Sequence, residues 1–299
     1  MVTPEYLKSG DKVGIISPAR FVSQDEIKKG IEWLTSEGFQ VVLGNNVLEQ
    51  DRQFAGSDLQ RASDFQQFLN DPDIKAIFST RGGYGSVRVV QQLNWNQFVK
   101  KPKWIVGFSD ITVFHSAVHQ KGIASLHAPM LFNLNQENIE PVSFEKTIAM
   151  LKGEKPTYTC QPHPFNKQGM ARGILVGGNL SVLYSLRGTD IDIFTGGKIL
   201  FLEDIDEYLY HIDRMMMNFK LGGKLDNLRG LIVGQMTDMK DNKIPFGKNA
   251  YEIIAEYASE LNIPVAFGFP AGHENINLPL ILGREILLEV DDEVSVTFR

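Results

Sequence analysis

The sequence predicts an α/β protein, with an N-terminal doubly wound parallel-sheet domain and a smaller β-rich α/β C-terminal domain. Two observations support this fold class. In the first half, short apolar runs alternate with amphipathic helical stretches, which is typical of a parallel sheet covered by helices. After residue 171 the spacing changes, and the chain ends in apolar–polar alternation on both sides of Asp291-Asp292, which predicts an antiparallel hairpin.

The elements of the first half follow from apolar runs and helix signals. Apolar runs predict strands at Lys12–Ser17, Gln40–Leu43, Lys75–Ser79 and Trp104–Val106. Ser23 followed by Glu26 has the spacing of a capping box and predicts a helix start. Further helices are expected over Asp58–Asn70, from the turn at Arg81–Gly85 through Leu93, and from about Asp110.

Residues 153–171 contain three prolines and follow neither the helix nor the strand period, so we interpret them as an interdomain linker. This gives an N-terminal domain over 1–152 and a C-terminal domain over 172–299. In the second domain we expect strands at Ile174–Val176, Lys198–Leu202, Gly230–Val233 and Val265–Phe267, and helices at Tyr208–Phe219 and Ala250–Leu261.

Composition excludes several classes of protein. Of 299 residues 43% are hydrophobic, the net charge is −6, and no basic patch stands out, so a nucleic-acid partner is not expected. No apolar run approaches the roughly 18–20 residues of a membrane helix, and the N-terminus lacks the pattern of a signal peptide. The single cysteine, Cys160, cannot form an internal disulfide. We therefore expect a cytoplasmic protein without a membrane partner.

The sharpest local feature is the stretch WIVGFSDITVFHSAV, which begins at Trp104. A buried strand runs into Gly107-Phe108-Ser109-Asp110, and a helix follows at once, so the turn can expose the Ser109 hydroxyl as a nucleophile. The alternative is that Ser109 or Asp110 simply caps the helix. Ile111 stands where a full nucleophile-elbow motif has glycine, so an α/β-hydrolase fold is not implied.

The glycine-rich turn STRGGYGS, from Ser79 to Ser86, also joins a strand to a helix at the carboxyl edge of the same sheet. Three interpretations stay open. The turn could cradle a phosphate, although no phosphate-loop motif fits. The N–H of Gly83 could complete an oxyanion hole for Ser109. The glycines could also serve only a tight turn.

A nucleophilic serine needs a base and an acid that orients it. Among the six histidines, His127 and His273 both follow apolar stretches and open loops, so either could be the base. Four acids end the run KILFLEDIDE, and Glu203 directly follows its apolar part. Spacing does not choose among them. His115 and His119 are four residues apart but lack a third ligand, so no metal site is expected.

Taken together, seven motifs resemble the LD-carboxypeptidase family of serine peptidases. In order they are SPA, STRGGYGS, WIVGFSDIT, LHAPM, GILVGGNLSVL, LFLEDIDE and GFPAGHEN. The resemblance extends from about Gly10 to the C-terminus. One departure is Ala128, where the family's LHAPM motif often has glycine.

The resemblance implies a catalytic triad of Ser109, Glu203 and His273, with an oxyanion hole formed by the N–H groups of Gly83 and Asp110. It implies a site in the cleft between the two domains, no metal or cofactor, and a homodimer. The expected reaction is release of the terminal D-alanine from a murein tetrapeptide during cell-wall recycling.

Arg81 and Asn179 are weaker candidates for substrate contacts. Two rival functions remain. A sister group, the microcin-type immunity peptidases, cleaves peptidyl nucleotides, but its members tend to be longer. A non-enzymatic two-domain ligand-binding protein would leave the triad motifs unexplained, and a Ser109 beyond hydrogen-bond reach of His273 would favour it. A nucleotide-binding enzyme would need a lysine and an acid that the glycine-rich turn lacks.

Overall fold

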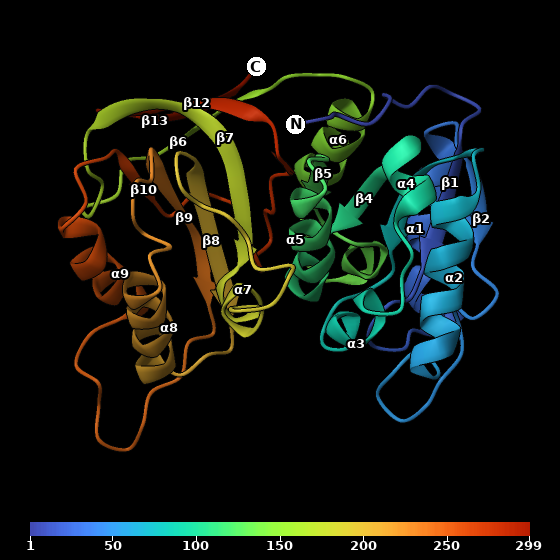
Figure 1. The fold of residues 1–299 in the computed structure, drawn as a ribbon, viewed down its shortest axis with the longest axis horizontal. Coiled ribbons are helices and arrows are strands. Elements are labelled where there is room, and N and C mark those ends of the chain that lie inside the picture. The colour runs from blue at the N-terminus through green and yellow to red at the C-terminus, as the bar shows by residue number, and fades with distance from the viewer. The chain divides into compact units, whose positions relative to one another are not determined.

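The computed structural model describes residues 1–299, and the chain divides into two compact units. The first unit contains residues 1–154 together with Leu278–Ile281, and the second contains residues 155–277 and 282–299. Each unit is built around one sheet (Figure 1). The return of Leu278–Ile281 to the first unit was not expected from the sequence, because its pairing partner lies about half the chain away.

The first unit contains a six-stranded sheet with the order β11-β5-β4-β3-β1-β2. Its strands are β1 Lys12–Ile16, β2 Gln40–Leu43, β3 Ile74–Ser79, β4 Trp104–Gly107, β5 Ser125–His127 and β11 Leu280–Leu282. The pairs from β2 to β5 are parallel. The predicted doubly wound parallel sheet is therefore confirmed. The strand order reverses between β1 and β3, which is where ligands bind in open α/β sheets.

The helices of the first unit begin largely where sequence signals place them. They are α1 Gln24–Ser36, α2 Asp58–Asn70, α3 Ser86–Val90, α4 Asn96–Lys100, α5 Thr112–Gln120 and α6 Pro141–Leu151, with short 3-10 helices η1 Ser109–Ile111 and η2 Leu131–Asn135. The capping box is confirmed, because the Ser23 hydroxyl accepts from the Glu26 N–H while Glu26 accepts from the Ser23 N–H. The helix α3 ends at Val90 rather than at the expected Leu93.

The second unit contains a seven-stranded sheet with the order β10-β9-β8-β7-β12-β13-β6. Its strands are β6 Thr157–Cys160, β7 Gly169–Asn179, β8 Ile199–Ile205, β9 Gly230–Thr237, β10 Val265–Phe267, β12 Glu285–Val290 and β13 Val294–Phe298. The strands β7 to β10 are parallel, and β12 and β13 form the predicted antiparallel hairpin. The helices are α7 Leu180–Ser185, α8 Leu209–Leu221 and α9 Ala250–Ser259.

The segment 153–171 differs from the linker that we expected. Thr157–Cys160 forms β6, which pairs antiparallel with β13, and Gly169 already begins β7. Only Tyr158 of this short strand is buried, while Thr157 and Thr159 are exposed. An edge strand of four residues between prolines gives too short an alternation to be recognised without its partner.

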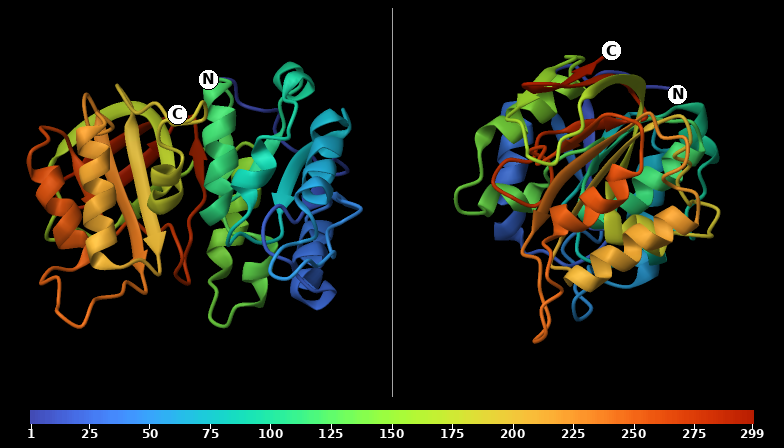
Figure 2. Two further views of the ribbon diagram at one scale, coloured as in Figure 1. Left: turned by 60° about the horizontal axis from the view of Figure 1, so that its bottom comes forward. Right: turned by 90° about the vertical axis from the view of Figure 1, so that its left-hand side faces the viewer.

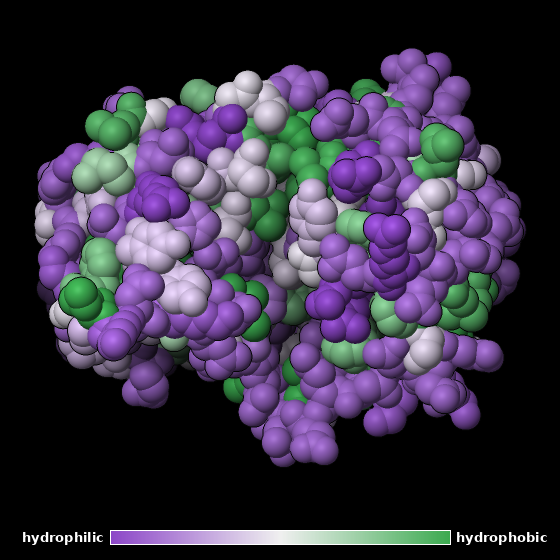
Figure 3. Space-filling model, turned by 90° about the horizontal axis from the view of Figure 1, so that it is seen from below, coloured by the Kyte–Doolittle hydropathy of each residue, from purple (hydrophilic) through white to green (hydrophobic).

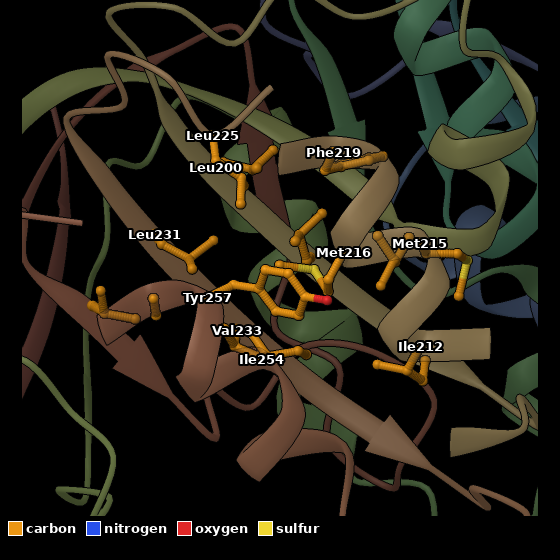
Figure 4. Packing of buried hydrophobic residues seen from close by; sticks show 14 of the residues in the cluster. Leu200, Ile212, Met215, Met216, Phe219, Leu225, Leu231, Val233, Ile254 and Tyr257 are labelled. Carbon is orange, nitrogen blue, oxygen red and sulfur yellow. The ribbon is translucent and has the colours of Figure 1, made fainter. Parts of the chain in front are cut away.

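The core of the second unit lies between its sheet and the pair of helices α8 and α9. Figures 1 and 2 show the two helices side by side across one face of β8 and β9. Figure 4 shows the packing of Leu200 from β8, Leu231 and Val233 from β9, and Met216 from α8. Each such side chain contributes about 1.5–3 kcal/mol when fully buried. This packing fixes the strands whose carboxyl ends carry the polar residues described below.

Polar side chains cover most of the face of the molecule shown in Figure 3. None of the helices has both the length and the apolar character that crossing a bilayer requires.

Candidate active site

Ser109 occupies a strained turn at the end of β4. Gly107 has φ +156°, Phe108 is extended, and Ser109 has φ +61°, in the left-handed region that side chains avoid. Such a conformation costs about 1–3 kcal/mol and persists where the surroundings impose it. The helix-cap interpretation is not supported, because neither η1 nor α5 has a side-chain cap. The geometry is that of a nucleophile elbow.

His115 holds the strand that leads into this elbow. Its Nε2 lies 2.8 Å from the carbonyl oxygen of Gly107, and its Nδ1 lies 2.8 Å from the Ser125 hydroxyl. Burial lowers the pKa of His115 to about 4, so the ring is neutral at pH 7. A neutral ring that donates from Nε2 to the carbonyl accepts from Ser125 at Nδ1. The buried His115 ring thus makes two hydrogen bonds that support the elbow.

Asp110 ties the elbow to the glycine-rich turn. Its carboxylate accepts a hydrogen bond of 2.8 Å from the N–H of Ser86, the first residue of α3. The side chain is buried, and burial raises the pKa of Asp110. The Asp110 carboxylate therefore caps α3 and does not cap η1, the short helix that contains Asp110. The backbone N–H of Asp110, near the start of η1, has no preceding turn to donate to.

The glycine-rich turn lies directly against Ser109. A side chain on Gly82 would place its Cβ 3.3 Å from the Ser109 Cβ and 3.4 Å from the Asp110 nitrogen. Gly83 has φ +107°, and a Cβ there would lie 2.2 Å from Cδ of Arg20. The backbone conformation of Gly83 therefore requires glycine, and a side chain on Gly82 would press against Ser109 and the Asp110 backbone. The contact between Gly82 and Ser109 favours the interpretation in which this turn serves the nucleophile.

In the second unit the structure brings Glu203 and His273 together. Glu203 lies near the end of β8 and is fully buried, and its Oε2 is 2.7 Å from Nδ1 of His273. The other histidine that remained open, His127, is buried at the end of β5, where its ring meets the Phe108 ring edge-on. Of these two histidines, only His273 pairs with Glu203. Its side chain is 13% exposed and therefore remains partly accessible.

The environment of His273 acts on its pKa in two directions. Burial acts to lower the pKa of His273, but the charge and hydrogen bond of Glu203, with a smaller effect of Asp204, raise it above its ordinary value. The imidazole therefore keeps a proton to a higher pH than a free histidine. This is the environment expected for a base that becomes an imidazolium during a reaction.

The neighbouring carboxylate, Asp204, has a structural role. Its Oδ1 accepts from Nδ2 of Asn179 at 2.9 Å, and its Oδ2 accepts from the Ser181 N–H at 2.8 Å. Asn179 in turn accepts from the Val182 N–H and caps α7. Burial, followed by the charge of Glu203, raises the pKa of Asp204 to about 7. A direct substrate contact by Asn179 stays a prediction, because its described contacts serve this cap.

A bulge in β9 shapes the loop that carries His273. Val233 pairs with Leu202 and Met236 with Asp204, so the two residues Gly234 and Gln235 lie opposite Glu203. The side-chain amide of Gln235 accepts from the Glu274 N–H at 2.9 Å and donates to the Ile276 carbonyl at 2.8 Å. Gln235 therefore fixes the loop from both sides of its turn. The sequence gives no signal for this role, because only the bulge turns the side chain towards the loop.

Arg81 is held on one side of the glycine-rich turn. Its guanidinium lies 4.2 Å from the centre of the Phe132 ring and 3.8 Å from Oε1 of Glu26. Its contact with substrate stays a prediction. No group of three or more histidine, cysteine, aspartate or glutamate side chains is arranged to hold a metal ion.

Comparison with known proteins assigns both parts of the chain to one family. Residues 13–128 match the model of the LD-carboxypeptidase N-terminal domain, and residues 172–288 match that of the LD-carboxypeptidase C-terminal domain. The chain belongs to the LD-carboxypeptidase family. This family consists of serine carboxypeptidases, so a hydrolase that acts on murein peptides is the function that membership supports.

Relatives match over almost their whole length. The probable murein peptide carboxypeptidase of Bacillus subtilis is 32% identical, with 98% of this chain and 93% of that protein covered. The murein tetrapeptide carboxypeptidase of Pseudomonas aeruginosa is 29% identical, with 93% of each chain covered. The crystal structure of muramoyltetrapeptide carboxypeptidase from Oxalobacter formigenes matches with a TM-score of 0.86 at 27% identity, covering 96% of this chain and 98% of that one.

A different branch of the family is also similar. The microcin C7 self-immunity protein MccF of Escherichia coli is 27% identical, with 97% of this chain and 94% of that protein covered. The chain is therefore similar both to murein peptide carboxypeptidases and to a self-immunity protein.

Proposed function

We propose that this protein is a serine LD-carboxypeptidase that releases the terminal D-alanine from murein tetrapeptide. The observation that carries the proposal is the left-handed Ser109 at the end of β4, packed against Gly82 of the glycine-rich turn. In the proposal, Ser109 of the first unit and the Glu203–His273 pair of the second unit form one triad. The names of the carboxypeptidase relatives support the murein substrate.

The proposed reaction begins when Nε2 of His273 takes the proton of the Ser109 hydroxyl. The serine oxygen attacks the scissile carbonyl carbon, and the resulting oxyanion accepts from the N–H groups of Gly83 and Asp110. His273 then gives its proton to the leaving nitrogen, and D-alanine departs from the acyl-enzyme. Water attacks the acyl group with His273 again as base, and Ser109 regains its proton. Glu203 stabilises the imidazolium throughout.

This mechanism uses no metal or cofactor. The wider role that we propose is cell-wall recycling in the cytoplasm by a homodimer, with the D-alanine cleaved from an L-centred diamino acid. Neither nucleic acid nor membrane takes part in it.

The experiment that tests the proposed function offers the purified protein three substrates in the presence of a metal chelator. They are murein tetrapeptide, the corresponding tripeptide, and an aminoacyl-sulfamoyl nucleotide, with products identified by mass spectrometry. We expect free D-alanine from the tetrapeptide alone. Cleavage of the nucleotide alone would instead support an immunity peptidase. Binding of a peptide without any cleavage would support a ligand-binding protein.

Glu203→Gln should lower kcat by about four orders of magnitude, as expected when the acid of such a triad becomes an amide. The neutral form of His273 is the base, so wild-type kcat/KM should fall as the pH drops through the raised pKa of His273. Without the Glu203 charge, burial dominates and lowers the pKa of His273. The acid limb of the residual activity should therefore move to lower pH, as a pH–rate profile would show.

Glu207→Gln is the matched control, because Glu207 ends the same acidic run and pairs with His211, not with His273. It should leave the acid limb in place. An unchanged limb in Glu203→Gln would show that another group is the base.

A further inference from the structure

We propose that Arg20 binds the free C-terminal carboxylate of the substrate and so makes the site selective for carboxypeptidase cleavage. This inference rests on the proposed function and deepens it. It assigns a ligand chemistry, a carboxylate, to a residue outside the triad and the oxyanion hole.

Arg20 lies across the glycine-rich turn. It follows Ser17-Pro18-Ala19 at the carboxyl end of β1, and its N–H donates to the Gly82 carbonyl at 3.4 Å. Its aliphatic stem lies over Gly83, where an added Cβ would be 2.2 Å from Cδ and 3.6 Å from Nε. Because Gly82 contacts Ser109, the guanidinium lies on the turn that flanks the nucleophile.

The positive charge around this turn is incompletely neutralised. Arg20 is exposed and forms no ion pair within 4.0 Å. Arg81 lies near enough that the charge of Arg20, after burial, lowers the pKa of Arg81. The carboxylate nearest Arg81 is Glu26, at 3.8 Å, and Glu26 is also engaged in the capping box of α1. Two neighbouring guanidiniums are thus accompanied by one carboxylate, which lies 3.8 Å from Arg81 and forms no ion pair with Arg20, in a chain of net charge −6.

A free carboxylate is the ligand that fits this arrangement. The planar guanidinium donates two parallel hydrogen bonds to a carboxylate. A carboxypeptidase substrate carries its terminal carboxylate one residue beyond the scissile carbonyl, and therefore close to the oxyanion hole. Arg81 is restrained by Phe132 and Glu26, whereas Arg20 has its guanidinium available. Arg20 is therefore the binding residue, and Arg81 strengthens the positive potential beside it.

The test measures equilibrium binding by calorimetry in the Ser109→Ala background, so that it does not depend on turnover. The ligands are murein tetrapeptide, its C-terminal amide, and the tetrapeptide with lysine in place of diaminopimelate. We expect the acid to bind about tenfold to a hundredfold more tightly than the amide. Adding Arg20→Gln should abolish this preference, and Arg20→Lys should restore part of it. Arg172→Gln, an exposed arginine of β7, removes the same charge and should change nothing.

Other outcomes would overturn the inference. An equal acid-to-amide preference with and without Arg20→Gln would show that another group binds the terminus. A preference that follows diaminopimelate over lysine, and not acid over amide, would show that Arg20 binds the side-chain carboxylate. If Ser109→Ala with Arg20 intact binds the tetrapeptide acid no more tightly than its amide, Arg20 does not bind the C-terminal carboxylate. A separate result tests the proposed function: if the wild-type enzyme releases no D-alanine, that function is wrong whatever the binding measurements show. Thermal melting of each variant confirms folding.

Discussion

Ser109→Ala should abolish release of D-alanine from murein tetrapeptide, with kcat lowered about a millionfold, as for other serine nucleophiles that act with a base. Without the hydroxyl, no acyl-enzyme can form, and only binding and the oxyanion hole remain to assist attack by water. The measurement is D-alanine release in a chelator, followed with an enantiomer-specific assay over hours. The control, Ser36→Ala, removes an exposed hydroxyl that donates to the Trp33 carbonyl and should retain wild-type activity.

Stability provides an independent check on the same position. Ser109 has φ +61°, which alanine tolerates no better than serine but glycine adopts freely. Ser109→Gly should therefore be more stable to urea than Ser109→Ala by about 1 kcal/mol, although both variants are inactive.

Two outcomes would contradict these expectations. Residual activity above about 1% of wild type in Ser109→Ala would identify a different nucleophile. Equal stability of the two variants would show that the elbow is not strained.

Local signals account for most of what the sequence predicted correctly. Two examples are the capping box of Ser23 and Glu26 and the elbow at Ser109. Each depends on residues a few positions apart, so a short stretch of sequence determines its geometry. The strand β6 depends on a partner more than 130 residues away, and β11 returns to a sheet formed by the first 154 residues. No local pattern reveals such pairings.

The two histidines that the sequence left open as candidate bases show the same limit. His127 and His273 have similar surroundings in the sequence, and only the pairing of Glu203 with His273 across 70 positions separates them. Family resemblance pointed to His273, and its role as the base stays a prediction. The resemblance did not reveal Gln235, whose role follows from a bulge that places two residues of β9 opposite Glu203. Positioning residues of this kind depend on register, which a single sequence does not specify.

Gly177→Ala should destabilise the fold more than any of the substitutions at the site. Gly177 pairs with Phe201 in the parallel ladder of β7 and β8 and has φ +137°. A Cβ there would lie 1.8 Å from the Phe201 carbonyl oxygen, which belongs to the backbone of the neighbouring strand. The strands must therefore separate locally. Backbone strain and overpacking together should lower the free energy of unfolding by about 3 kcal/mol or more, as a urea titration would show.

Gly177→Ala should also change the position of Glu203, because Asn179 pairs with Glu203 two residues further along this ladder. Folded Gly177→Ala should therefore also lose activity, through displacement of the Glu203 carboxylate from His273. Gly173→Ala is the matched control in β7, since its Cβ would lie no closer than 3.3 Å to any atom and its φ is not in the positive range. It should change stability by less than about 1 kcal/mol. If Gly177→Ala unfolds at the same urea concentration as Gly173→Ala, the close approach of β7 to β8 is not required for the fold.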